Sequence, residues 1–304
     1  MRFNQNRFFS LSLFVLYGFI TIGTTVWARE VEEAMQWNMV AEKSAYAPGE
    51  PVLLNIQITN PSEQDGEIWF GSDGLNAFSF KIKDAKGEIL QQAGKIERLG
   101  LTRWGFVKIP ARQFRVKCVV LNQWCSTLLP YGKYTIVCSI EPKYVPENKP
   151  NEEAPLRAQI LPTVDLECSL ELTEVAMTDF NQIIANLTSK AFQDVHTREG
   201  VQERSLAREM LSFTESPLAV TYQLEVLEYW QSTWLARDVI EQLVKSNTLK
   251  AAQGLVKILE EEKKTPAKYL KREIVEGVYR LRDKGDPNII NATSEFVSKH
   301  PRGQ

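Results

Sequence analysis

Apolar residues recur at every second position across much of the first half of the chain, from Ser44 to about Leu172. Alternation with this period is typical of β-strands that bury one face. Turn residues such as Asn60 with Pro61, and 84–87 (Asp-Ala-Lys-Gly), separate the alternating runs, and no helical period lies between them. The pattern predicts an antiparallel β-sandwich. The expected strands contain Val52–Ile58, Phe78–Ile82, Phe114–Val120, Tyr134–Ile140 and Val164–Leu172.

The apolar period changes to about 3.6 residues after Thr173, which predicts helices. One short segment recurs in outline as Leu206–Leu211, Leu235–Ile240 and Leu270–Val275, and each copy precedes a turn and a second apolar stripe. The offsets between copies are 29 and 35 residues. Such pairs resemble HEAT-type repeats, which stack helix pairs into an array, and an irregular helical bundle is the alternative.

The N-terminal segment has the features of an export signal. Arg2 and Arg7 precede a nearly continuous apolar run, Phe8–Ile22, and small residues at Val26 and Ala28 fit cleavage after Ala28. The run is shorter than the roughly 20 residues of a membrane helix. We therefore expect an exported protein, periplasmic or extracellular, with no stable membrane span after cleavage; an uncleaved N-terminal anchor is the alternative. The expected units are a signal peptide (1–28), a β-sandwich (29–172) and a helical domain (173–304).

Charge argues against a nucleic acid partner. The chain has a formal net charge of −2, and residues 1–28 contain two arginines and no acid, so the mature chain carries −4. Lysine and arginine are interspersed with acids throughout, whereas a binder of the phosphate backbone shows a basic stripe.

One local motif points to a more particular fold. The sequence 128–134 (Leu-Leu-Pro-Tyr-Gly-Lys-Tyr) leads directly into an alternating strand. It resembles the tyrosine corner of immunoglobulin-like sandwiches, in which a Tyr hydroxyl bonds to the backbone upstream. Together with the turns at 46–50, 59–61 and 83–87, it makes about 130 residues similar to the Ig-like domains of bacterial exported proteins and of the bacterial intracellular proteinase-inhibitor family. Cys138 follows Tyr134 by four residues instead of the antibody-type two, so a true immunoglobulin domain is not expected. The resemblance implies a fold and no activity.

Four cysteines in an exported chain raise the question of disulfides. Cys118, Cys138 and Cys168 occupy the apolar phase of their strands, so we expect them to face one core. Three connectivities are open. We favour Cys118–Cys138 with Cys125–Cys168, and four buried thiols that behave as small hydrophobes are the alternative.

No catalytic or metal-binding pattern is evident in the sequence. The chain has two histidines, His196 and His300. His196 and Asp194, two residues apart, are the residue types of a catalytic base and the carboxylate that orients it. No nucleophile motif accompanies them. We expect no cofactor, no metal and no enzymatic activity; carboxylates that converge only in the fold would leave an enzyme open.

The function predicted from these features is a non-enzymatic protein-interaction module of the cell envelope, with an unidentified protein partner. Candidate contact residues are Arg208, Arg237 and Arg272, at equivalent positions of the three copies, and Tyr144 in the Pro-rich segment Pro142–Pro155. Salt bridges between stacked repeats are the alternative role for the arginines. Inhibition of an exported peptidase, with that segment as the inhibitory loop, is a second hypothesis.

Overall fold

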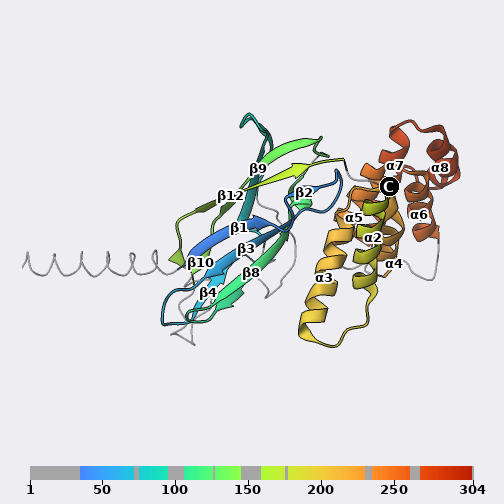
Figure 1. Cartoon of the computed structure of the whole chain (residues 1–304). Helices are drawn as coiled ribbons and strands as arrows, with labels where there is room; N and C mark the ends of the chain where they lie inside the picture. Colours follow the sequence, from blue (N-terminus) through green and yellow to red (C-terminus); the bar gives the residue numbers. More distant parts are fainter. Residues whose placement is uncertain are drawn as a thin grey trace, which may run out of the picture.

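The computed structural model describes residues 35–71, 75–94, 106–125, 127–144, 159–174, 177–229, 235–260 and 268–302. Strands occupy the first part of the chain and helices the second (Figure 1). The change falls between Leu172 and Met177, at the position where the apolar period changes. The chain is therefore built of an N-terminal β part followed by a helical part.

The strands of the β part form three sheets. The first has the order β1 (Gln36–Ala41), β3 (Leu53–Thr59), β8 (Phe114–Val120). The second has the order β11 (Gln159–Ile160), β10 (Lys143–Tyr144), β4 (Gly66–Trp69), β7 (Phe106–Ile109). The third has the order β2 (Ala45–Tyr46), β12 (Val164–Leu172), β9 (Gly132–Ile140), β5 (Phe78–Lys83), β6 (Ile89–Ala93). The expectation of purely antiparallel pairing is wrong at one place, because β2 and β12 run parallel.

All five predicted runs correspond to strands, although Val52 lies one residue before β3, and four of them bury the apolar phase as expected. Ile56 and Ile58 of β3, Phe80 of β5 and Ile136 of β9 are almost fully shielded from solvent in one apolar cluster. Aromatic rings add to it, since Phe80 lies 4.7 Å from Trp124, measured between ring centroids. Each such side chain contributes about 1.5–3 kcal/mol through burial.

The run in β8 behaves differently. Its residues Phe114 and Val116 are 55% and 47% exposed, so the expectation that this apolar phase is buried throughout is wrong. The register explains the result: Phe114 pairs with Thr59 and Val116 with Gln57, both on the outer face of β3. Alternation predicts that a strand has two different faces, but it does not say which face meets the core.

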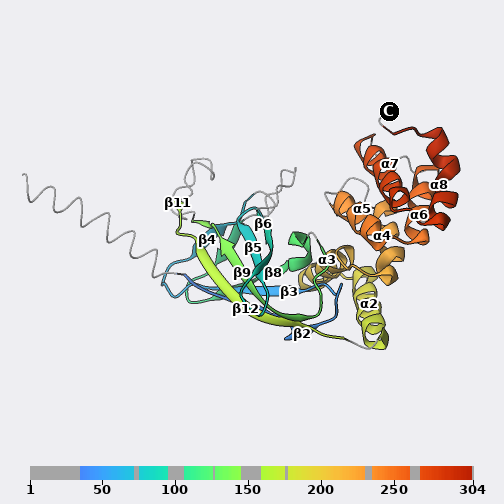
Figure 2. The ribbon, with the colours of Figure 1, turned by 90° about the horizontal axis from the view of Figure 1, so that it is seen from above.

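The helical part consists of seven α-helices among the described residues. They are α2 (Met177–Phe192), α3 (Arg198–Ser212), α4 (Val220–Tyr229), α5 (Leu235–Ser246), α6 (Leu249–Glu260), α7 (Lys268–Asp283) and α8 (Pro287–Lys299). Helices α3, α5 and α7 contact one another in turn, and so do α4, α6 and α8. Gly254 and Gly277 let neighbouring helices of a row pack closely. A Cβ atom at Gly254 of α6 would collide with Leu224 of α4, and one at Gly277 of α7 would collide with Ile240 of α5. The two rows extend away from the sheets (Figure 2).

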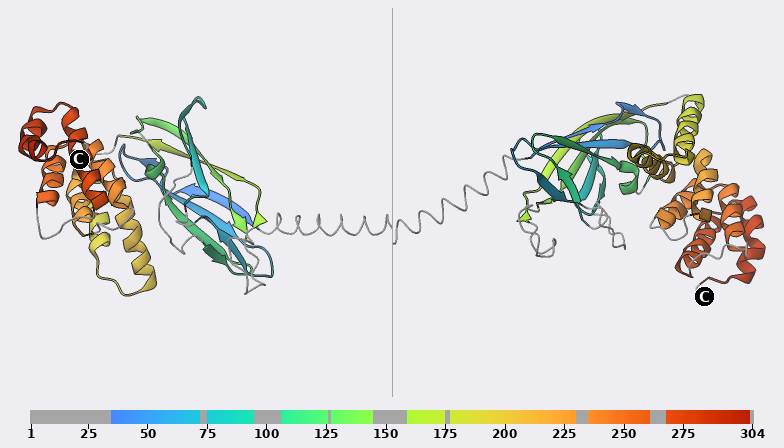
Figure 3. Two further views of the ribbon diagram at one scale, coloured as in Figure 1. Left: turned by 180° about the vertical axis from the view of Figure 1, so that it is seen from behind. Right: turned by 90° about the horizontal axis from the view of Figure 1, so that it is seen from below.

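Direct hydrogen bonds join the two parts. The amide of Glu215, in the turn after α3, donates to the carbonyl of Gly49 at 3.0 Å. The Lys245 ammonium of α5 donates to the carbonyl of Cys125 at 3.2 Å, and the Gln123 amide donates to the Glu209 carboxylate. Leu53 and Val120, at one end of β3 and β8, belong to the apolar cluster of the helices. The parts therefore share a packed contact, and Figure 3 shows them side by side from two further directions.

Candidate functional site: an open sheet face beside the helical part

The outer face of the three-stranded sheet is partly uncovered. The strand register arranges it in rows: Val40 with Asn55 and Cys118, then Asn38 with Gln57 and Val116, then Gln36 with Thr59 and Phe114. The side chains of Val40, Val116 and Phe114 are all exposed, by 50%, 47% and 55%. We call the surface formed by Gln36, Asn38, Val40, Gln57, Thr59, Phe114 and Val116 the open face. Its polar members are amides and a hydroxyl, without a formal charge.

The same face is covered at its other end. Val120 and Leu53 form the next row beyond Cys118, and both are buried in the apolar cluster of the helices. Cys118 is half-buried against that cluster, with its Sγ 3.3 Å from Oδ1 of Asn55. In Figure 1, β8 runs from the end distant from the helices toward α3. A single strand thus passes from an uncovered apolar surface into an interface between the two parts.

The edge of this sheet carries charge on its inner side. Among the described residues β8 pairs with β3 alone, which makes it an edge strand. Arg115 and Lys117 stand opposite Ile58 and Ile56, on the phase that faces the core. Inward-pointing charges on an edge strand prevent another strand from pairing there, because pairing would bury them. The edge is therefore protected while the face is not.

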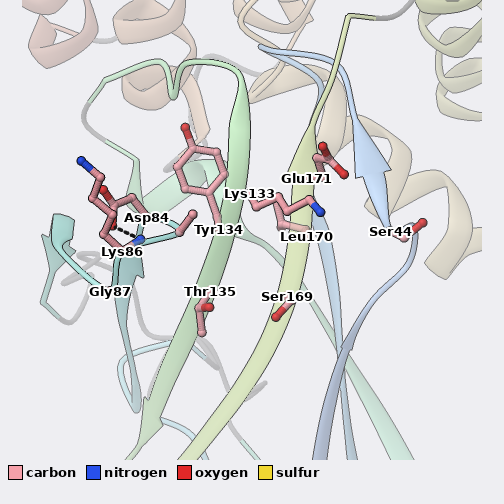
Figure 4. A pocket seen from close by; sticks show the side chains of 11 residues that line it. Ser44, Asp84, Lys86, Gly87, Lys133, Tyr134, Thr135, Ser169, Leu170 and Glu171 are labelled. Atoms are coloured by element: carbon pink, nitrogen blue, oxygen red, sulfur yellow. Dashed lines mark hydrogen bonds between the residues drawn. The ribbon is translucent and has the colours of Figure 1, made fainter.

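A second surface feature is a shallow groove of about 530 Å³ on the five-stranded sheet (Figure 4). Cross-strand pairs Lys133 with Glu171 and Thr135 with Ser169 form its floor. Of its other polar groups, the Asp84 carboxylate accepts the amides of Lys86 and Glu88, both at 2.9 Å, and so holds the β5–β6 turn.

The Tyr134 hydroxyl at the end of this groove also has a partner in the fold. It donates to the carbonyl of Pro130 at 2.6 Å, which is the upstream backbone bond expected of a tyrosine corner. The Asp84 carboxylate and the Tyr134 hydroxyl thus stabilise the fold. The remaining polar side chains of the groove, Glu171 included, form an ordinary solvated surface.

A third cavity lies where the two parts meet. Gly49, Glu50, Cys125 and Glu215 are among the residues around it, and its volume is about 30 Å³. A small-molecule site needs roughly 300 Å³ or more. This cavity is thus too small for a ligand of that kind.

The structure places the three predicted arginines differently from one another. The Arg208 guanidinium is half-buried and donates through Nε to the carbonyl of Ala191 at 2.8 Å, tying α3 to the end of α2, and burial lowers its pKa. Arg237 and Arg272 are exposed on α5 and α7.

The burial pattern also sets Arg272 apart from the other two arginines. Leu211 and Ile240 are buried 29 residues apart, but the next buried equivalent, Ile274, follows after 34 residues. Arg272 is therefore one position out of step with Arg208 and Arg237. An ion pair between stacked helices is instead made by Arg280 of α7 with Glu241 of α5, with 2.9 Å from Nη2 to Oε2. This pairing lowers the pKa of Glu241.

Tyr144 is not in a loop, contrary to expectation. It ends β10 and pairs with Ile68 of β4 and Gln159 of β11. Backbone pairing on both sides explains why this part of the Pro-rich segment is a strand. The rest of that segment, 145–155, lies outside the described residues.

All four cysteines are free thiols in the structure. The expected bonds Cys118–Cys138 and Cys125–Cys168 are absent, and the expectation that three thiols face one core is wrong for Cys118. Its side chain packs against the helical cluster, whereas Cys138 is buried in the cluster of the β part. Burial raises the pKa of Cys168 to about 11 and that of Cys125 to about 12. These thiols are accordingly neutral near neutral pH.

The remaining candidate chemistry is exposed. The side chains of His196 and Asp194 are 88% and 86% exposed, with Nε2 3.7 Å from Oδ2. Within the ranges that the structure describes, no group of three or more His, Cys, Asp or Glu side chains is placed to hold a metal. The described helices likewise include none long and apolar enough to cross a membrane.

Comparison with known proteins adds no family. The chain matches no family model and no curated protein. Among solved structures it is similar to a structural-genomics target called SoR45 (15% identity, 47% of this chain and 92% of that chain, TM-score 0.26). It is also similar to the sporulation control protein Spo0M from Bacillus subtilis (13% identity, 51% and 55%, TM-score 0.24). A third is the cupredoxin domain of amoB from Nitrosocaldus yellowstonii (8% identity, 47% and 93%, TM-score 0.18). Scores of this size carry no functional argument.

Proposed function

We propose that this chain is an exported, non-enzymatic protein-interaction module of the cell envelope. It acts in the periplasm or outside the cell, and its work is to hold a protein partner against the open face. The observation that carries the proposal is the exposure of Phe114 and Val116 on a sheet face whose other end, at Leu53 and Val120, is covered by helices. Apolar side chains gathered on one surface mark a site of association more often than a scattered single residue does.

The architecture suits such a role. In this proposal the β part is an Ig-like sandwich, supported by the Tyr134–Pro130 bond, and the helical part is a HEAT-like array, supported by the two rows of helices in contact. Arrays of this kind present extended surfaces to partners. Lys245, which bridges Cys125 and Glu215, holds the array close to the open face. A partner can then contact both parts at once.

The test is capture of the partner by the full chain, produced in the cell that makes it and compared with two double variants. Phe114→Ser with Val116→Thr removes the apolar surface, and Ile89→Ser with Leu90→Thr removes two similarly exposed apolar residues from β6. Because all four side chains are exposed, both variants keep the melting temperature within a few degrees.

We expect capture by the first variant to fall at least tenfold and capture by the second to remain. Equal capture by both variants, or none by the unchanged chain, would overturn the proposal.

A further inference from the structure

The open face is continuous with an interface that already exists in this chain. From Val120 through Cys118 to Val116 and Phe114, the same phase of β8 faces outward, and helices cover the Val120 end. Val116 lies four residues from Val120, about 13 Å along a strand. The diameter of a helix with its side chains is about 10–12 Å. A second helix therefore fits on the open face next to the helical cover.

The edge of the sheet excludes the main competing mode of binding. An added strand would pair with β8 and bring Arg115 and Lys117 into a buried interior. A helix needs no edge, because its backbone hydrogen bonds are made within itself. The centre of the open face presents side chains, such as that of Gln57, and no free backbone groups. A helix can bind there because it also makes its contacts through side chains.

The size and chemistry of the face define that helix. Three strands are about 10 Å across, and the rows from Cys118 to Phe114 add about 13 Å, so the diagonal is about 16 Å, or about 11 helical residues. Val40 and Phe114 lie at opposite corners and require an apolar stripe, while Asn38 and Gln57 between them require no charge.

We propose that the open face binds an amphipathic helix of the partner protein, with an apolar stripe toward Phe114, Val116 and Val40. This inference rests on the proposed function, since it names the kind of partner that the same surface takes. The helix lies beside the helical cover and extends it over the rest of the sheet.

The test places the photocross-linking residue p-benzoylphenylalanine at Val40, Phe114 or Val116 of the full chain, one position at a time, in the producing cell. Leu90 of β6, 44% exposed, is the control position. Mass spectrometry of the linked peptides identifies the partner residues that each position reaches.

We expect links from the three positions to fall within about 11 partner residues, spaced by three, four or seven. Partner residues spaced by two, or links to a second copy of this chain, would overturn the proposal that the partner presents a helix. Binding at this face would still stand. No links at any of the three positions would overturn the proposed function itself.

Discussion

The Glu215 carboxylate and the Lys245 ammonium meet at 3.0 Å where the two parts of the chain join, with side chains only 10% and 29% exposed. Both also contact the β part, Glu215 through its amide to the carbonyl of Gly49 and Lys245 through its ammonium to the carbonyl of Cys125. Two residues of the helical part thus bind two loops of the β part and each other. This arrangement holds the helices beside the open face.

Replacing Lys245 by Met is expected to lower the free energy of unfolding by about 1–3 kcal/mol, because it leaves the shielded Glu215 carboxylate without its cation. The measurement is urea denaturation followed by circular dichroism. Lys299→Met is the matched control, since Lys299 pairs with Glu295 on the surface, where both side chains are more than half exposed. An exposed pair of this kind contributes little to stability, because water screens its charges. Equal losses in the two variants would show that the junction pair has no special role.

Gly49→Ala tests the junction from the other side. Gly49 has φ +82°, and a Cβ atom there would lie 2.5 Å from the Glu215 carbonyl oxygen. Gly87 has nearly the same conformation, φ +84°, with no atom near its Cβ position. Gly87→Ala should therefore lower the free energy of unfolding only through backbone strain, by about 1–2 kcal/mol. Gly49→Ala should lower it by at least about 1 kcal/mol more, since the backbone at Glu215 must also move to make room for the Cβ atom. Urea midpoints measure both, and a smaller loss for Gly49→Ala would contradict the close contact.

The thiol chemistry gives a third expectation. All four cysteines are free, and burial raises the pKa of Cys125 and of Cys168 above the ordinary value of 9.0. A protonated, shielded thiol is a poor nucleophile. Native protein at pH 8 should react slowly with iodoacetamide at these two positions, and protein unfolded without reductant should show four reactive thiols. Detection of two or fewer thiols in the unfolded chain would restore the disulfide expectation.

The raised pKa of Cys125 also makes the stability of the protein depend on pH in the alkaline range. Between about pH 9 and the raised value of about 12, the Cys125 thiol ionises in the unfolded chain but stays protonated in the folded chain. The unfolded state then binds fewer protons, so stability falls as pH rises through this range. Cys125→Ala should make the urea midpoint fall less steeply between pH 9 and 11 than in the unchanged chain. Parallel slopes would show that the thiol titrates normally.

The sequence predicted the elements of the fold better than it predicted the site. The five alternating runs became strands and the change of period at Thr173 separated strands from helices, because local periodicity directly reflects which positions can share a face. The open face was missed because Phe114 and Val116 alternate in the same way whether they face the core or solvent. The pairing of β8 with β3 decides between the two, and pairing over more than 50 residues leaves no local pattern.

A similar reason explains the arginines. Arg208, Arg237 and Arg272 align by residue type, but the register of burial shifts by one residue before Ile274, so the alignment by type does not give a common face. Arg208 instead hydrogen-bonds to the carbonyl of Ala191 and so stabilises the end of α2. The one signal for the open face was the pair of charges at Arg115 and Lys117, which are unusual on a phase that faces a core.

The last prediction concerns those charges. If Arg115 and Lys117 protect the edge of the three-stranded sheet, replacing both by Val will create an apolar edge strand with unpaired backbone groups, next to the apolar Phe114 and Val116. The double variant should remain folded and self-associate, visible as a shift to larger species in analytical ultracentrifugation at tens of micromolar protein.

The control for this prediction is Lys81→Val with Lys83→Val. It removes the same charge from β5, which is paired on both sides, with β6 and with β9. A loss of charge alone lowers solubility in both variants equally, whereas an opened edge affects only the β8 variant. Self-association of both would therefore attribute the effect to net charge, and a monomeric β8 variant would show that the edge needs no protection. Association of the β8 variant alone would establish why a partner must use the face of this sheet instead of its edge.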